Sequence, residues 1–209
     1  YADYARSGFF QLLWVAGITL VVLILFSRIT ALKQPSSKRA FLVLAEIAIV
    51  LTLLIVAVAS MRLSLYENAY GFTMLRLYSH LFAGWVAVVF LLLAADIGGL
   101  FRRRRWFVGA TAMTALTLLL VLNVANPEVL VARFNVNRAA STGKLDPQYL
   151  TELSSDAVPT LLASHAQLQP AQFSQIKVAV CNGPRTYTPS PAAFNLAEAD
   201  AAAARRENC

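Results

Sequence analysis

A polar stretch at residues 62–80, RLSLYENAYGFTMLRLYSH, separates two apolar runs and holds the side chains best suited to chemistry. It supplies guanidinium donors, phenol hydroxyls and a carboxylate. If the stretch is helical, Arg62 and Tyr66 share a face, because residues four apart on a helix are neighbours. Such donors can hold a phosphate or carboxylate head group. The candidate ligand or partner site is therefore Arg62, Tyr66, Glu67, Tyr70 and Arg76.

The same residues also have a plainer interpretation. Arg62 and Arg76 can be anchors at a membrane–water interface, each close to Glu67, while the tyrosines belong to the aromatic belt found there. The sequence leaves both interpretations open.

Glu46 is a second candidate because it interrupts an apolar run. A carboxylate inside a membrane span is costly and usually faces the bundle interior, which makes a proton or ion relay one hypothesis. The alternative is that water reaches it, or that Arg39 or Arg102 neutralises it. Asp96 lies closer to the end of its run and is offset by the four arginines that follow.

The chain carries no HExxH, CxxC, GxSxG or glycine-rich phosphate loop. Its two histidines, His80 and His165, fall in separate regions, so we expect no metal site and no cofactor. We expect a non-enzymatic protein, and a membrane enzyme acting on lipid-linked substrates is the third hypothesis, after a transporter.

Apolar runs are the elements that must position these residues. The chain is 58% hydrophobic and only 14% charged, whereas soluble domains are about half apolar and about a quarter charged. Runs of ~20 residues can cross ~30 Å of hydrocarbon. We predict an all-α membrane protein with four transmembrane helices at residues 8–32, 40–61, 81–101 and 106–125, followed by a small helical domain at residues 126–209.

The net charge of +7 comes from the apolar part, since residues 126–209 carry seven basic and seven acidic side chains. Basic residues at the ends of apolar runs mark the cytoplasmic side. We therefore expect membrane lipids, not nucleic acid, as partners. Four crossings place the insert and the C-terminal domain outside the cytoplasm. The basic residues form two clusters: Arg28, Lys33, Lys38 and Arg39, and Arg102 to Arg105.

Helix start signals recur in the C-terminal part. Asn126-Pro127-Glu128 predicts a helix over residues 127–140, ended by Gly143, because asparagine caps a helix and proline suits its first turn. Further starts are predicted at Asp146-Pro147, at Ser155 or Asp156, and at Ser190-Pro191. Apolar residues alternate with others over residues 175–180, which predicts a short strand. A domain of this size is marginal alone, so we expect it to rest on the membrane part.

Cys181 and Cys209 are the two cysteines of the chain. In an oxidising compartment such a pair forms a disulfide more often than it stays as two thiols. Two unpaired thiols near a frayed terminus are the alternative.

Four segments are distinctive in their order along the chain: YARSGFFQLLWV, YENAYGFTMLRLY, NPEVLVARFNVNR and KLDPQYLTELSSDAVPTL. Together they resemble the later half of an uncharacterised bacterial family of polytopic membrane proteins, a domain of unknown function numbered four-one-seven-three, with a sister family numbered four-one-five-three. The resemblance covers roughly residues 1–162, and Tyr70, Gly71, Thr73, Leu75 and Arg76 are most similar to both families. It implies a bacterial inner membrane protein with further spans upstream of Tyr1, and it implies an architecture without a chemistry.

Our leading functional hypothesis is an accessory or scaffold component of a larger membrane complex. It would bind a partner protein through the insert and the C-terminal domain. The alternative is a transporter or lipid-handling protein, with Glu46, Arg62, Glu67 and Arg76 lining a path.

Overall fold

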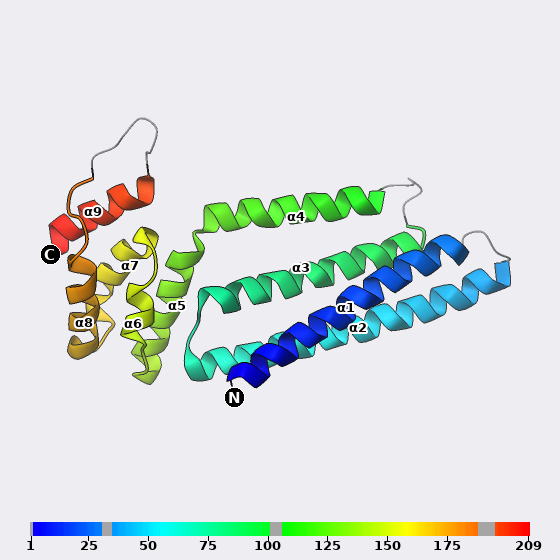
Figure 1. Cartoon of the computed structure of the whole chain (residues 1–209), viewed down its shortest axis with the longest axis horizontal. Coiled ribbons are helices and arrows are strands. Elements are labelled where there is room, and N and C mark those ends of the chain that lie inside the picture. The colour runs from blue at the N-terminus through cyan, green and yellow to red at the C-terminus, as the bar shows by residue number, and fades with distance from the viewer. Residues whose placement is uncertain (1, 31–34, 101–105, 188–194) are drawn as a thin grey trace. The chain divides into compact units, whose positions relative to one another are not determined.

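The computed structural model describes residues 2–30, 35–100, 106–187 and 195–209. All regular structure in these ranges is helical, so the strand predicted at residues 175–180 is wrong, and that segment lies in α8. Figure 1 shows long helices followed by shorter ones. The helices are α1 (Ala2–Thr30), α2 (Pro35–Tyr70), α3 (Met74–Ile97), α4 (Trp106–Ala125), α5 (Pro127–Thr142), α6 (Pro147–Thr151), α7 (Val158–Ala163), α8 (Pro170–Cys181) and α9 (Leu196–Asn208), with 3-10 turns at Ser155–Ala157 and Ser164–Ala166.

Contacts between residues divide the chain into two compact units. The long-helix unit comprises Tyr1–Glu67 and Tyr78–Val121, and the C-terminal unit comprises Asn68–Leu77 and Leu122–Cys209. The C-terminal unit thus includes the middle of the polar insert, which the sequence alone assigned to the transmembrane part. Both ends of that segment fall inside helices, α2 and α3.

Within the residues that the structure describes, three helices are long and apolar enough to cross a membrane: Lys38–Tyr70 of α2, Met74–Ile97 of α3 and Trp106–Ala125 of α4. The apolar stretch Leu13–Ser27, which is the part of α1 described throughout, is shorter than a full span. The insert is mostly helical, because α2 runs on to Tyr70 and α3 already begins at Met74. Residues 62–70 contain no glycine or proline, so nothing ends α2 before Gly71.

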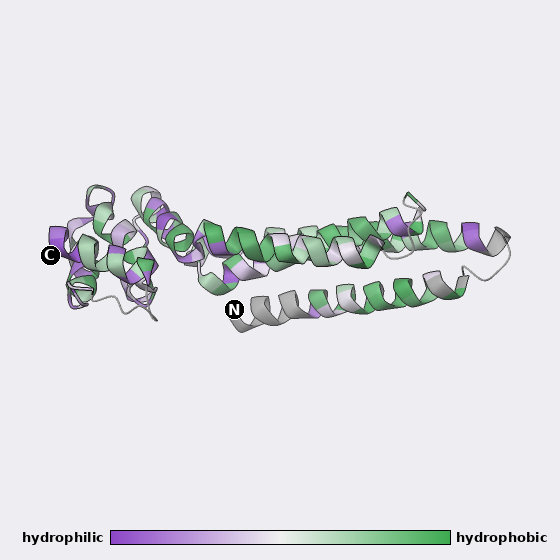
Figure 2. Ribbon diagram, turned by 90° about the horizontal axis from the view of Figure 1, so that it is seen from above, coloured by the Kyte–Doolittle hydropathy of each residue, from purple (hydrophilic) through white to green (hydrophobic). Residues whose placement is uncertain are grey.

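Helices α1, α2 and α3 pack around a narrow core of Ala16, Leu23, Ala45, Ile49, Phe90 and Leu93. Alanines at this contact let the helix backbones approach closely, as in membrane bundles. Large apolar side chains point outward instead, among them Trp14, Leu44 and Met61. Figure 2 shows apolar residues along most of the length of these helices. An apolar exterior of this extent suits a lipid environment.

Helix α4 has no buried residue among those described. The indole Nε1 of Trp85 on α3 donates to the Thr114 hydroxyl of α4 at 3.2 Å, and Phe107 packs partly against the α1–α3 core. Its other large side chains, such as Leu116 and Val124, are exposed.

The C-terminal unit has its own core, and its first two helices begin where the capping signals predict. Asn126 caps α5 by accepting from the Val129 N–H, Gly143 ends α5 with φ of 70°, and Asp146 caps α6. The predicted start at Ser190-Pro191 lies outside the described residues. In the described part of the chain, α9 begins at Leu196 after a cap by Asn195. The core is formed by α5 to α9 and includes Ala132, Val136, Leu150, Leu161, Leu162, Ile176 and Ala201.

A disulfide and an arginine fasten the C-terminal end of the chain to the end of α8. Cys181 and Cys209 form the disulfide, with a Cα–Cα distance of 5.7 Å. The Arg205 guanidinium of α9 donates to the Val180 carbonyl at 2.8 Å and to the Pro184 carbonyl at 3.1 Å. The Val180 carbonyl, at the end of α8, also accepts from the Gly183 N–H at 3.2 Å.

Candidate functional site

The corner between α2 and α3, residues 71–73, is held by side chains of the C-terminal unit. The Phe72 N–H donates to Asn135 Oδ1 at 3.0 Å, and Asn135 Nδ2 donates to the Phe72 carbonyl at 2.7 Å. The same Nδ2 also donates to the Val131 carbonyl of α5 at 2.9 Å. Asn135 is only 7% exposed, so its amide replaces water for both backbone groups of Phe72.

Arg138 of α5 caps the C-terminus of α2. Its guanidinium donates to the Asn68 carbonyl at 3.1 Å and to the Ala69 carbonyl at 2.8 Å. A third bond, at 3.2 Å, reaches the Lys144 carbonyl. The last turn of α2 has no basic residue of its own, so Arg138 supplies the cation that a helix C-terminus favours.

Tyr149 of α6 caps the N-terminus of α3. Its hydroxyl accepts a hydrogen bond from the Met74 N–H at 2.8 Å. Burial raises the pKa of the Tyr149 phenol above its ordinary value, and this effect outweighs the opposing one of the Met74 N–H. The phenol therefore stays neutral to a pH above its usual range.

Gly71 allows the close approach of α5 to the corner. Its φ is +89°, and a Cβ there would lie 2.9 Å from Asn135 Oδ1. Beside it, the Phe72 and Phe134 rings pack with their centroids 5.2 Å apart, and Arg76 donates to the Gly71 carbonyl. We call these contacts of residues 68–76 with α5 and α6 the corner clamp.

The structure distributes the predicted site residues over the two units. Arg62 is exposed and Tyr66 half-buried, both on α2 in the long-helix unit. Glu67 lies against His80, with His80 Nε2 3.0 Å from Oε1 and 3.1 Å from Oε2 of the carboxylate. Tyr70 is exposed and Arg76 half-buried, both in the C-terminal unit.

Glu46 is half-buried on α2, beside Ala45 in the α1–α3 core. Asp96 is exposed near the end of α3. Within the described residues, no group of three or more histidine, cysteine, aspartate or glutamate side chains could hold a metal ion.

Three residues of the corner clamp were not singled out from the sequence: Asn135, Arg138 and Tyr149. Each nevertheless lies in a segment that carries the family resemblance. YENAYGFTMLRLY contributes the clamped backbone, NPEVLVARFNVNR contributes Asn135 and Arg138, and KLDPQYL contributes Tyr149. The signal available in the sequence was therefore the resemblance of these three segments, which the structure brings into contact.

Helices long and apolar enough to cross a membrane, with large apolar side chains facing outward, define an α-helical membrane protein. Its family model is a domain of unknown function, DUF4153, which matches residues 1–164. The chain therefore belongs to the DUF4153 family, as its resemblance to this pair of families predicted. No curated protein and no solved structure gives a significant match.

Proposed function

We propose that the chain is a non-enzymatic accessory or scaffold component of a bacterial inner membrane, which binds a partner protein through its outer side. The corner clamp is the observation that carries this proposal. It holds the middle of the insert, residues 68–76, inside the C-terminal unit, so the polar groups of this segment serve folding. We infer that this segment of the insert belongs to a domain whose role is to bind a partner.

The proposed topology has four crossings, with α1 as the first. Both basic clusters then face the cytoplasm, as the positive-inside bias requires. The C-terminal unit lies on the outer side, an oxidising compartment in which a disulfide between Cys181 and Cys209 persists.

Two features favour binding over transport. The charges expected to line a path make internal contacts, since Glu67 lies against His80 and Arg76 bonds to Gly71. The C-terminal unit also exposes Val178 and Leu196, each at 64% of its surface. Exposed apolar side chains of this kind suit contact with another protein.

A transporter or lipid-handling protein is the second candidate, and the half-buried Glu46 of α2 favours it. A carboxylate in an apolar span usually has a functional reason. In this case Glu46→Gln abolishes the cellular function, whereas a scaffold retains it.

Site-specific photo-crosslinking in native membranes tests the proposal. A photoreactive amino acid is placed at Val178 or Leu196 in the C-terminal unit, and at Leu116 of α4 as the lipid-facing control. We expect one protein to be crosslinked in stoichiometric amount from the first two positions and lipid from the third. The partner must also remain bound to the full chain through gentle purification.

Crosslinks to lipid alone from all three positions, with a purified chain that carries only lipid or ions, would contradict the scaffold. That result would direct attention to Glu46.

A further inference from the structure

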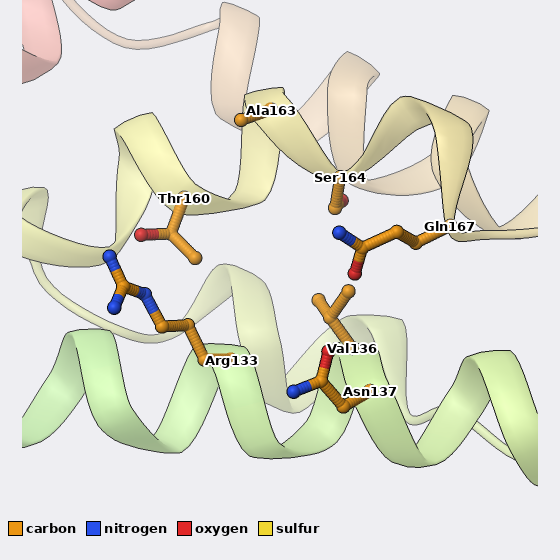
Figure 3. Close-up of a pocket in the computed structure, with 7 residues that line it drawn as sticks. All are labelled: Arg133, Val136, Asn137, Thr160, Ala163, Ser164 and Gln167. Atoms are coloured by element: carbon orange, nitrogen blue, oxygen red, sulfur yellow. The ribbon is translucent and has the colours of Figure 1, made fainter.

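A cleft of about 270 Å³ lies in the C-terminal unit between α5 and the α7 region. Figure 3 shows side chains from both sides turned toward it. Its volume is just below the roughly 300–1,000 Å³ of sites that hold drug-sized ligands, so it fits a smaller molecule. The lining residues used below are Arg133, Val136, Asn137, Thr160, Ala163 and Gln167.

Most polar side chains around this cleft form no bond with the described part of the chain. Within the described residues, no hydrogen bond or ion pair is made by the side chains of Arg133, Asn137, Thr160 or Gln167. Their neighbours differ: Asn135 and Arg138 hold the α2–α3 corner, and the buried Ser164 donates to the Leu161 carbonyl at 2.6 Å. Arg133, Asn137 and Gln167 are exposed and Thr160 is half-buried, so water solvates these groups and a ligand in the cleft can reach them.

The helical period places this set on its own face of α5. Residues 133, 136 and 137 are spaced i, i+3 and i+4, so they share one face, while Asn135 and Arg138 point to the opposite side. One face of α5 therefore maintains the corner, while the other carries the exposed Arg133 and Asn137 on either side of the core residue Val136.

The chemistry of the cleft selects the ligand. Arg133 is the single charged side chain among its described lining residues, and a planar guanidinium matches a carboxylate in a two-bond fork. The amides of Asn137 and Gln167 and the Thr160 hydroxyl add neutral donors. A dianionic phosphate would keep one charge uncompensated, whereas a carboxylate is neutralised. Val136 and Ala163 add apolar lining from opposite sides of the cleft.

We propose that this cleft binds the carboxylate of a small organic acid, paired with Arg133, with the apolar part of the acid against Val136 and Ala163. The site goes beyond the proposed scaffold role and does not depend on it, because no partner protein takes part.

Calorimetric titration of the full chain in lipid nanodiscs tests this site, with phenylacetate as the probe and phenylacetamide and inorganic phosphate as comparisons. We expect saturable binding of phenylacetate and weaker binding of the other two. Arg133→Gln should weaken phenylacetate binding roughly tenfold or more, the size expected for a charged hydrogen bond. Arg206→Gln removes an exposed arginine of α9 outside the cleft and should leave the affinity within roughly twofold.

A chemical readout locates the probe. Bound phenylacetate should slow the modification of Arg133 by phenylglyoxal, measured by mass spectrometry, and should not protect Arg206. Arg133→Gln should melt like the unsubstituted protein, since Arg133 is exposed and makes no bond in the described part of the chain. The proposal is overturned if phenylacetate shows no saturable binding, if the amide or phosphate binds as tightly, or if Arg133→Gln binds normally.

Discussion

At the scale of the residue, the corner clamp depends on a few polar atoms. Asn135 satisfies a donor and an acceptor of Phe72, and Tyr149 and Arg138 satisfy the helix ends on either side of it. Buried backbone groups that lose such partners cost about 1–3 kcal/mol each, more than the net gain from forming the bond. Substitutions at these residues are therefore sharper probes than substitutions on the surface.

Asn135→Leu keeps the side-chain size but removes both bonds to Phe72. We expect a loss of about 2 kcal/mol in the free energy of unfolding, because two backbone groups of Phe72 stay buried without partners. Thermal unfolding of the full chain in detergent measures the change. Asn137→Leu, at an exposed neighbour on α5, is the control, and equal melting temperatures for the two variants would refute the clamp.

Gly71→Ala tests the backbone of the corner. The positive φ and the approach of Asn135 Oδ1 both oppose a Cβ at this position, so we expect a loss of at least about 1 kcal/mol. Gly84→Ala on α3 is the matched control, since a Cβ there meets nothing within 4 Å. Alanine suits a helix better than glycine, so this control should be neutral or slightly stabilising.

Tyr149→Phe should cost about 1 kcal/mol at neutral pH, because the Met74 N–H loses its acceptor. The pKa of Tyr149 is raised by burial, so the folded protein favours the neutral phenol. This contribution is complete below the unfolded pKa of about 10 and is lost as the pH rises through the folded value. Comparing the melting temperatures of the two proteins across this range should show the difference narrowing at alkaline pH.

At the scale of the element, how well the sequence predicted the structure depends on the range of the signal. The caps at Asn126 and Asp146 and the end at Gly143 were predicted, because each acts within a few residues. The corner clamp was not, because its bonds join residues 63 to 75 positions apart. The sequence predicts a strand over residues 175–180, but the segment is helical. Ile176 and Val180, four residues apart, share one helix face and pack into the core of the C-terminal unit.

The disulfide between α8 and α9 gives a prediction for these two elements. The cysteines are 28 residues apart, and closing such a loop stabilises a unit by about 3–4 kcal/mol on the chain-entropy estimate. We expect the paired substitution Cys181→Ser and Cys209→Ser to lower the melting temperature. Reductant should lower the melting temperature of the unsubstituted protein alone; an equal fall in both would mean that the disulfide contributes nothing.

At the scale of the whole molecule, composition predicted an all-helical membrane protein, and three helices in the described part of the chain are long and apolar enough to cross. The predicted site residues fall in both units, and composition cannot show which polar side chains the fold uses internally. Glu67 illustrates this, since it lies against His80, which is not among the predicted site residues.

The proposed topology predicts where a thiol label can reach. After mild reduction of intact cells, a membrane-impermeant maleimide should modify Cys181 or Cys209, and the double serine variant should stay unlabelled. Modification seen only after lysis would place the C-terminal unit in the cytoplasm and remove the proposed outer binding surface.

The separation of 63 positions between Phe72 and Asn135 also sets an order of events during synthesis. At about 5–20 residues per second, Asn135 is made roughly 3–13 s after Phe72. During that time the ends of α2 and α3 lack the side chains that later cap them. Water or the insertion machinery has to satisfy these groups, so a ribosome stalled before α5 should leave a hairpin that proteases can cut at its corner.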